Sequence, residues 1–254
     1  GRARSAVSAR FASAQLCCCS HRVAGLLVER ERHAHVNEHE GLAAKGHDLD
    51  PRELNYRTGD EFAQAVKGRT SDVLIFLDTH GRTYNTPGHS LPSARGQGEP
   101  LSGRFKPKEG ARFIGVLIGA GEQKALMASN AGFGFVGQLD DMVTKNKAGK
   151  ACLSVPNGGV ALPPVLLSQE LLAAEVSYVA AVTDQGRLLV FPLAELPALA
   201  RGKGNRLINV PTTAFKAGAE EMVGVVALGE RDELLVHAGQ RHLRMKPKDL
   251  ESYI

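Results

Sequence analysis

Three loops of this sequence combine Arg and Lys side chains with glycine, a combination suited to binding phosphate groups. The cations are Arg95, Arg104, Lys106 and Lys108 in the first loop, Lys145, Lys147 and Lys150 in the second, and Arg201, Lys203 and Arg206 in the third. Glycine lets the backbone come close to a phosphate, and Arg and Lys neutralise its charge. No acidic residue lies between Arg201 and Arg206. The pattern predicts that these loops bind a polyanion.

Two other interpretations of the basic loops stay open. Cations on loops are most often part of a solvated surface, and this interpretation fits any one of them taken alone. A nucleotide pocket needs G-x-x-x-x-G-K-[ST], or G-x-G-x-x-G between a strand and a helix, and none of the loops has either pattern. Recurrence of the basic loop at one position of a repeat favours the polyanion.

The sequence offers little to a catalytic or metal site. A His–Asp pair at residues 47–48 and a His–Ser pair at residues 89–90 lie in turn-like stretches, where such residues commonly form local hydrogen bonds. Asp140 and Asp141 begin a short helical stretch that they are expected to cap. The four tyrosines stand in no context that marks a nucleophile. We therefore predict no catalytic residues in this chain and no metal ligands.

A repeat of about fifty residues must position the loops. Its anchor is a short apolar strand, a turn that ends in glycine, and a second strand, centred on Gly81, Gly132, Gly186 and Gly239. By difference of residue numbers, these glycines lie 51, 54 and 53 residues apart. Turn-forming side chains precede three of them, as tight hairpins require where φ becomes positive: Asp78, Asn130 and Asp184.

A second glycine follows each of the first three hairpins at a nearly constant distance. Positions 98, 149 and 204 lie 17, 17 and 18 residues after the turn glycine, and each belongs to a basic loop that leads into another strand. Gly41 and Gly59 are also 18 residues apart, so residues 41–62 are interpreted as part of an earlier copy. The chain therefore has four clear hairpins and about five repeat units.

Stacked blades of antiparallel sheet follow from this repeat. A unit of about four short strands cannot bury both of its faces alone, so neighbouring units must pack against each other. The apolar runs expected as inner strands between neighbouring sheets are residues 73–77, 113–118, 179–182 and 234–236. Helices are expected only in short pieces, such as residues 139–143 and 193–199. The predicted class is all-β and propeller-like.

Composition indicates a globular protein. A chain of 254 residues with 43% hydrophobic residues can bury a substantial core. The net charge of +4 is too small by itself to indicate nucleic-acid binding. No apolar stretch approaches the roughly 20 residues needed to cross a bilayer. Three consecutive cysteines at positions 17–19 and a lone Cys152 do not resemble a disulfide framework, which favours a reducing, cytoplasmic setting.

Residues 1–40 differ from the rest of the chain. Ala, Ser, Arg and His dominate, no acidic residue precedes Glu29, and neither strand nor helix periodicity persists. We predict an atypical, disordered leader over residues 1–40 and a folded domain over residues 41–254, in a chain that is itself a piece of something longer. A transit peptide is one alternative. Another is a zinc site built from Cys17, Cys19, His33, His35 and His39.

Longer motifs run from Ala44 to the C-terminus. They read AKGHDLD, LNYRTGDEF, GRTYNTPGHSLPSARGQGEPLSG, MASNAGFGFV, NKAGKACLSVP, GRLLVFPLAELPALARGKGNRLINVP and RHLRMKPKDL. These motifs resemble the C-terminal domain of the A subunit of bacterial DNA topoisomerase IV, which is related to that of the gyrase A subunit. The resemblance implies a β-pinwheel of about five blades that exchange a strand with their neighbours, with duplex DNA bent around a basic outer rim.

The resemblance also sets expectations for partners and sites. The DNA-binding residues expected on the rim are Lys67, Arg69, Arg95, Arg104, Lys145, Lys147, Lys150, Arg201, Lys203, Arg206, Arg241 and Arg244. The catalytic tyrosine, the winged-helix domain and the ATPase subunit are implied to lie outside this chain. No cofactor is expected here, since ATP and Mg would act on other parts of the enzyme. The implied partners are duplex DNA, the rest of the A subunit and the B subunit that carries the ATPase, in the cytoplasm at the nucleoid and without a membrane.

The sequence departs from the family pattern in three ways. The first-blade strand expected before Lys45 is not recognisable in ERERHAHVNEHEG, so blade one is expected to lack a strand, as a shifted reading frame upstream would explain. The segment that normally follows DLESYI is missing, which predicts incomplete closure between the last and first blades. No glutamine- and arginine-rich box typical of gyrase is present, which favours the topoisomerase IV side.

The resulting hypothesis is a domain that holds and bends duplex DNA, guiding decatenation and supercoil relaxation by the whole enzyme. One alternative is a protein-interaction propeller that binds no DNA, with apolar or acidic patches on its loops. Another is a propeller-type hydrolase, which needs paired carboxylates at a central funnel where the repeat loops offer cations.

Overall fold

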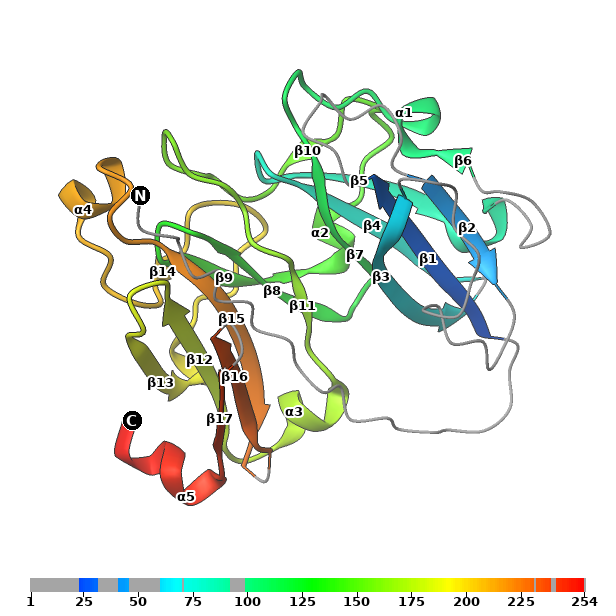
Figure 1. Cartoon of the computed structure of the whole chain (residues 1–254). Coiled ribbons are helices and arrows are strands. Elements are labelled where there is room, and N and C mark those ends of the chain that lie inside the picture. The colour runs from blue at the N-terminus through cyan, green and yellow to red at the C-terminus, as the bar shows by residue number, and fades with distance from the viewer. Residues whose placement is uncertain are drawn as a thin grey trace. The chain divides into compact units, whose positions relative to one another are not determined.

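Short antiparallel strands and one-turn helices make up the structure, a computed structural model that describes residues 23–31, 41–45, 60–69, 71–91, 99–230, 232–238 and 241–253 (Figure 1). The chain divides into two compact units. The N-terminal unit comprises the described residues of Cys19–Gln123 and Gln138–Cys152. The C-terminal unit comprises those of Lys124–Gly137 and Leu153–Ile254.

The N-terminal unit contains two four-stranded sheets. The first has the strand order β3-β1-β2-β6, with β1 (Val23–Glu31), β2 (Gly41–Lys45), β3 (Asp60–Arg69) and β6 (Glu99–Pro100). The second has the order β10-β5-β4-β7, with β4 (Val73–Asp78), β5 (Arg82–Pro87), β7 (Phe113–Gly119) and β10 (Lys150–Ala151). Three short helices accompany them, η2 (Gly88–Ser90), α1 (Leu101–Arg104) and α2 (Leu139–Met142).

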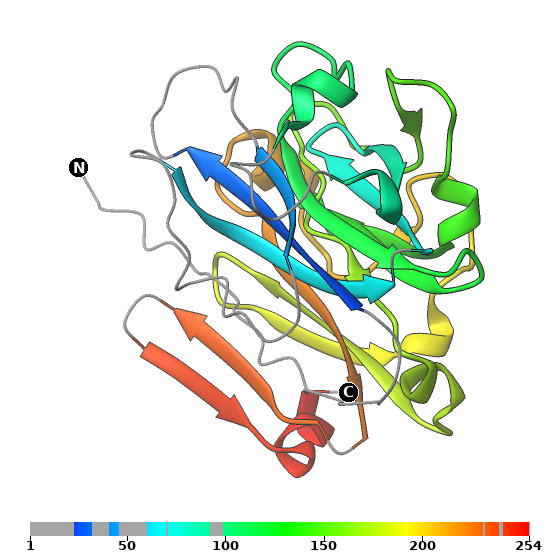
Figure 2. The ribbon, with the colours of Figure 1, turned by 90° about the vertical axis from the view of Figure 1, so that its right-hand side faces the viewer.

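The C-terminal unit contains a four-stranded sheet, a three-stranded sheet and a hairpin. The four-stranded sheet has the order β11-β8-β9-β14, with β8 (Lys124–Ser129), β9 (Phe133–Gln138), β11 (Val165–Leu166) and β14 (Asn205–Arg206). The three-stranded sheet has the order β13-β12-β15, with β12 (Ser177–Thr183), β13 (Leu188–Pro192) and β15 (Met222–Gly229). The hairpin pairs β16 (Leu234–Ala238) with β17 (Arg241–Met245), shown in orange to red in Figure 2. The helices are α3 (Gln169–Ala173), η3 (Leu193–Glu195), α4 (Thr212–Lys216), α5 (Pro247–Leu250) and η4 (Glu251–Tyr253).

One rule builds all three four-stranded sheets. Each starts from a hairpin, and a later strand pairs with the first strand of that hairpin: β3 on β1, β7 on β4 and β11 on β8. The second strand of each hairpin pairs with a two-residue strand that comes after the next hairpin in the sequence: β6 on β2, β10 on β5 and β14 on β9. This return of a later strand to an earlier sheet is the exchange that defines a pinwheel. The predicted all-β class and its strand exchange are confirmed.

The turn glycines of the hairpins have the predicted conformation. Gly81, Gly132 and Gly186 have φ values of 76°, 81° and 81°. Each donates its backbone N–H over 3.0 Å to the carbonyl three residues earlier. Left-handed φ is cheap only for glycine, so these positions end the turn where the sequence predicts. Gly239 lies outside the described residues.

Strand β12 is buried on both faces, as predicted for an inner strand. Val179 and Ala181 pack with Leu126 and Val136 of the sheet that contains β8 and β9. Ala180, on the opposite face, packs in a second cluster together with Leu234, Met245 and Leu250. Because successive side chains of a strand point to opposite faces, the apolar run of β12 joins two layers of the C-terminal unit.

An aromatic cluster forms the core of the N-terminal unit. Tyr84 packs against the rings of Phe105 and Phe113, with ring centroids 5.4 Å and 5.2 Å away. Phe76 lies 5.6 Å from Phe105. Val66 of β3 packs against the same cluster, so both sheets of this unit contribute to one core.

The structure corrects the prediction for the start of the chain. β1 lies within residues 1–40, and it pairs with both β2 and β3, so the first sheet does contain a strand before Lys45. Gly25 interrupts the short apolar run of this strand, and apolar and polar residues do not alternate strictly along it. The segment therefore lacks the usual sequence signals of a strand. Residue 40 as a domain boundary stays a prediction. The cysteines and histidines of the alternative zinc site lie outside the described residues.

The second correction concerns helix length. The stretch predicted as helical over residues 193–199 is helical only as η3, which ends at Glu195. Pro197 explains the early end, because the residue before a proline is pushed into extended backbone, and Leu196 has φ −80° and ψ 135°.

Within the described residues β13 pairs only with β12. Closure between the last and first blades stays a prediction.

Candidate nucleic-acid interface

Two of the basic loops lead directly into an exchanged strand. Gly149 precedes β10 with a φ of 72°, and Gly204 precedes β14 with a φ of 77°. A Cβ atom on Gly204 would lie 2.0 Å from the carbonyl oxygen of Gly134, and one on Gly149 would lie 2.6 Å from the Tyr84 ring. Glycine therefore lets each basic loop pack against the hairpin that receives its strand.

Asparagine side chains order the loop before β10. Asn85 Oδ1 accepts the Thr144 N–H over 2.7 Å. Asn146 accepts the Ala148 N–H at its side chain and the Gly149 N–H at its carbonyl, both over 2.9 Å. Asn side chains that bond the backbone two residues on mimic a turn, so this loop has a defined shape.

Arg82 holds the end of the same loop. Its Nε donates to the carbonyl of Ala148 over 2.9 Å, and its Nη2 donates to the carbonyl of Gly149 over 2.6 Å. Arg82 is the first residue after the turn glycine of its hairpin. Its fork of donors therefore joins the hairpin to the basic loop.

The three cations of this loop differ in their surroundings. Lys145 and Lys147 are exposed, and their ammonium groups form no hydrogen bond or ion pair with the rest of the described structure. Lys150 is half-buried and donates to the backbone carbonyl of Asp141. Lys145 and Lys147 are thus free to contact an anion, while Lys150 already has a partner.

The loop before β14 follows the second strand of its hairpin. Val136 accepts the Leu199 N–H over 2.9 Å and donates to the Pro197 carbonyl over 3.0 Å. Further along, the Gly202 carbonyl accepts the Ser154 N–H over 2.8 Å. These backbone bonds hold the loop while Arg201, Lys203 and Arg206 are all exposed.

An aromatic ring brings two of these cations together. Lys203 Nζ lies 3.6 Å from the centroid of the Phe133 ring, and Arg206 Cζ lies 5.7 Å from it. Both are within the roughly 6 Å over which a cation is attracted to a ring face. Arg206 also donates from Nη1 to Asn209 Oδ1 over 2.8 Å.

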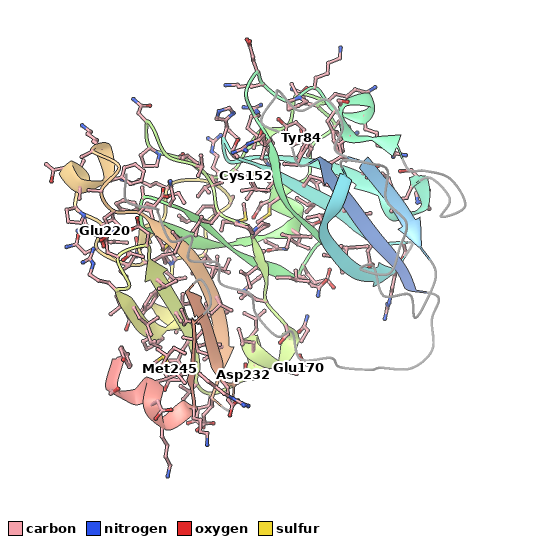
Figure 3. The ribbon with its side chains drawn as sticks, viewed as in Figure 1. Tyr84, Cys152, Glu170, Glu220, Asp232 and Met245 are labelled. Atoms are coloured by element: carbon pink, nitrogen blue, oxygen red, sulfur yellow. The ribbon has the colours of Figure 1, made fainter. Side chains whose placement is uncertain are left out.

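Arg187 is a neighbouring cation that the sequence analysis did not select. Its Nη2 donates over 2.6 Å to the carbonyl of Asn209, whose side chain binds Arg206. Its Nε donates over 2.6 Å to Oε1 of Glu220, which lies near α4 in Figure 3. Arg187 follows the turn glycine directly, as Arg82 does, and that shared position was the available signal.

The first basic loop is only partly described, and Arg95 lies outside the described residues. Arg104 donates from Nη1 to Thr86 Oγ1 over 3.1 Å and from Nη2 to the Ser90 carbonyl over 2.6 Å. These contacts tie α1 to the end of β5. Lys106 and Lys108 are exposed.

The other predicted cations are scattered. Arg69 is exposed at the end of β3. Arg244 forms an ion pair with Glu233, which compensates its charge. Lys67 lies on β3 and Arg241 on β17, and their side chains are outside the described part. Each unit therefore has its own group of predicted cations, around Lys145 and Lys147 in one and around Lys203 and Arg206 in the other.

The N-terminal unit buries a thiol, that of Cys152. Burial raises the pKa of the Cys152 thiol, so the thiol stays protonated. Its sulfur lies 3.1 Å from Thr83 Oγ1. Among the described residues no three His, Cys, Asp or Glu side chains gather as a metal site requires. No helix in that part of the chain is long and apolar enough to span a membrane.

Comparison with known proteins gives the family. Residues 177–228 match the family described as "DNA gyrase C-terminal domain, beta-propeller". The solved C-terminal domain of Escherichia coli ParC superposes with a TM-score of 0.77 at 35% identity, over 91% of this chain and 89% of that one. The chain belongs to the family of topoisomerase IV A-subunit (ParC) C-terminal domains.

Full-length members of the topoisomerase IV A-subunit family show the same relationship. The A subunit of DNA topoisomerase 4 from Pseudomonas aeruginosa is 45% identical over 210 residues, which are 83% of this chain and 27% of the relative. Its counterpart from Escherichia coli K12 is 38% identical over 241 residues, 89% of this chain and 31% of the relative. The chain thus spans about a quarter to a third of these relatives.

A gyrase domain shares the fold at lower identity. The C-terminal domain of DNA gyrase A superposes with a TM-score of 0.57 at 12% identity, over 84% of this chain and 67% of that one. The predicted resemblance to the topoisomerase IV A subunit is confirmed, with the gyrase domain as a more distant structural neighbour.

Proposed function

We propose that this domain binds duplex DNA through the glycine-containing basic loops that precede its exchanged strands, and bends it. The observation that carries the proposal is the loop of Arg201, Lys203 and Arg206. Its backbone is fixed along β9, its three cations are exposed, and no acidic residue lies within it. Lys145 and Lys147 occupy the equivalent loop of the N-terminal unit.

Duplex DNA fits these loops better than a small anion does. Single cations spaced along ordered loops suit the regular phosphates of a nucleic-acid backbone, whereas a small anion needs donors that converge on one point. Such contacts fix the position of DNA without reading its bases. We therefore expect binding that tolerates any sequence.

Bending requires several loops to act on one duplex. A bend of 40–90° over 20–30 base pairs costs on the order of 1–6 kcal/mol, which phosphate contacts along the bent path must offset. Each neutralised phosphate adds about 0.9 to the negative slope of log affinity against log salt. Binding is thus expected to weaken steeply as salt rises.

The first test removes the three cations of the C-terminal loop. In Arg201→Ala/Lys203→Ala/Arg206→Ala, affinity for a duplex of about 30 base pairs falls on the order of tenfold or more, and the salt slope falls by about 2 to 3. The matched control is Lys216→Ala/Lys246→Ala/Lys248→Ala, which removes three exposed lysines outside the basic loops. Fluorescence anisotropy across a salt series measures both quantities.

The control separates a local contact from general attraction. If both triple variants lose the same affinity, binding follows net charge and the loop is not the site. Circularisation of short DNA fragments measures bending. If the wild-type domain does not accelerate ring closure, the proposal that it bends DNA is contradicted.

In the whole enzyme, we propose that the domain holds a duplex segment and helps select the crossing that is passed. This proposal rests on the same loops and on the similarity to A subunits of DNA topoisomerase 4. Decatenation and supercoil relaxation, with ATP and Mg acting on other parts, then require the rest of the A subunit and the B subunit that carries the ATPase. A cytoplasmic location at the nucleoid follows from this role.

A further inference from the structure

One position recurs in two of the hairpins that receive an exchanged strand. It is the first residue after the turn glycine, occupied by Arg82 in the N-terminal unit and by Phe133 in the C-terminal unit. Its backbone pairs with the exchanged strand in both cases, since Arg82 faces Ala151 and Phe133 faces Arg206. The two side chains therefore stand at the same place relative to the basic loop of their sheet.

Arg82 and Phe133 hold their loops by different chemistry. The Arg82 guanidinium binds the carbonyls of Ala148 and Gly149, the last two residues before β10. The Phe133 ring faces the ammonium of Lys203 and the guanidinium of Arg206, on either side of Gly204. One side chain fixes the loop backbone, and the other gathers the loop cations directly.

We propose that the residue after the turn glycine is the positioning residue of the basic loops before β10 and β14. Arg82 orients the loop that carries Lys145 and Lys147, and Phe133 orients Lys203 and Arg206. The role rests on the proposed function, because it concerns how these cations are presented to DNA phosphates. Neither Arg82 nor Phe133 needs to touch DNA to act in this way.

The physical basis is preorganisation. A long cationic side chain that must be ordered on binding loses rotamer freedom, and this loss reduces affinity. A ring that already restricts Lys203 and Arg206, or a guanidinium that already fixes the loop of Lys145 and Lys147, lowers that loss before DNA arrives. The number of phosphates contacted is unchanged.

Variants that conserve charge test the two positions. Phe133→Leu keeps an apolar side chain but removes the ring, whereas Phe133→Trp keeps a ring face for the cations. Arg82→Lys keeps the charge but loses the fork that reaches two carbonyls. The matched controls are Phe215→Leu, at a half-buried ring in α4, and Arg112→Lys, at an exposed Arg before β7.

The expected result is a loss of affinity without a change in salt slope. Phe133→Leu and Arg82→Lys each bind duplex DNA about three- to tenfold more weakly, since exposed cation–π contacts and single hydrogen bonds are of that order. Phe133→Trp stays within about twofold of wild type, as do both controls. Loss of a phosphate contact instead lowers the slope by about 0.9.

A double-mutant cycle shows whether Phe133 acts through the cations. In a Lys203→Ala/Arg206→Ala background, Phe133→Leu has no further effect on affinity, because the ring then has nothing to orient. A merely structural role of Phe133 predicts the same loss in both backgrounds. Urea unfolding of each variant gives its stability separately.

Proton NMR of the free domain detects the contact between Lys203 and the Phe133 ring in the absence of DNA. The Lys203 side-chain methylene resonances are shifted upfield by the Phe133 ring, and they move to ordinary positions in Phe133→Leu. If the wild-type domain binds duplex DNA and Phe133→Leu and Arg82→Lys bind it with the same affinity, this inference alone is overturned. A wild-type domain that binds no duplex overturns the proposed function, and this inference with it.

Discussion

Asp78 shows how one buried carboxylate organises a hairpin. Its side chain is 0% exposed, and Oδ1 accepts the backbone N–H groups of His80 and Arg82, each over 2.9 Å. Oδ2 accepts the hydroxyl of Tyr84 over 2.8 Å. Burial, and then the Asp78 carboxylate, raise the pKa of Tyr84 well above its usual range. The turn that carries Arg82 therefore depends on a buried charge that Tyr84 helps to satisfy.

Replacing Tyr84 tests this contact at the scale of one residue. Tyr84→Phe leaves one oxygen of a buried carboxylate without its donor, so the free energy of unfolding at pH 8 should fall by about 1–3 kcal/mol. Urea unfolding measures the change. Tyr178→Phe is the control at a partly buried tyrosine of the C-terminal unit, and a loss no larger than in this control contradicts the assignment.

The same contact predicts a pH dependence. The pKa of Tyr84 is raised in the folded state, so the unfolded state releases this proton first as the pH passes about 10. The folded state then binds more protons, and the stabilisation present below that pH is lost as the pH rises. The difference in unfolding free energy between wild type and Tyr84→Phe should therefore shrink above about pH 10. A constant difference from pH 8 to 11 would falsify this.

At the scale of elements, the exchanged strands are short and rely on the loops before them. β14 has two residues, and it reaches β9 only because Gly204 passes directly against Gly134. Gly218 provides a contrast, since its φ is also positive, at 63°, but a Cβ there would meet no atom within 4 Å. The two glycines share a backbone requirement and differ in the space available.

This contrast separates steric exclusion from backbone strain. Gly218→Ala is expected to cost about 1 kcal/mol of stability from its left-handed backbone alone. Gly204→Ala adds a clash with the Gly134 carbonyl, so it should cost about 1–3 kcal/mol more and weaken the pairing of β14 with β9. Urea unfolding gives the free energies, and hydrogen exchange at Leu207, whose N–H donates to the Gly132 carbonyl, reports on β14. Equal losses in the two variants would exclude the steric account.

At the scale of the whole molecule, each unit holds its basic loop with its own residues. Arg82 and Asn85 fix the loop of Lys145 and Lys147, and Phe133 and Val136 contact the loop of the C-terminal unit. Under the proposed function, the two loops are therefore independent suppliers of phosphate contacts.

Independence predicts additive effects on DNA binding. The free-energy loss of Lys145→Ala/Lys147→Ala should add to that of the triple variant of the C-terminal loop within about 0.5 kcal/mol. The salt slope should fall by about 0.9 for each contact removed. Anisotropy measurements on the two variants and their combination test both. A combined variant no weaker than the triple variant would show that the N-terminal loop does not contact DNA.

Much of the architecture was readable from the sequence because its signals are local. A hairpin turn shows itself through Asp78 and Gly81 within a few residues, and a repeat of such turns predicts stacked antiparallel sheets. The constant distance from the turn glycine likewise predicts the glycines before β10 and β14. Apolar runs such as that of β12 also predict burial on both faces without any knowledge of the partners.

Which cations remain free was decided only in three dimensions. Arg104, Lys150 and Arg244 are among the predicted DNA-binding cations, yet the fold gives each a nearby acceptor. Arg82 and the loop that it holds lie 66 residues apart in the chain. Strand exchange joins them, because it returns a later segment to an earlier sheet. Period and turn chemistry are properties of neighbouring residues, whereas the partners of a side chain depend on which distant segments the sheets bring together.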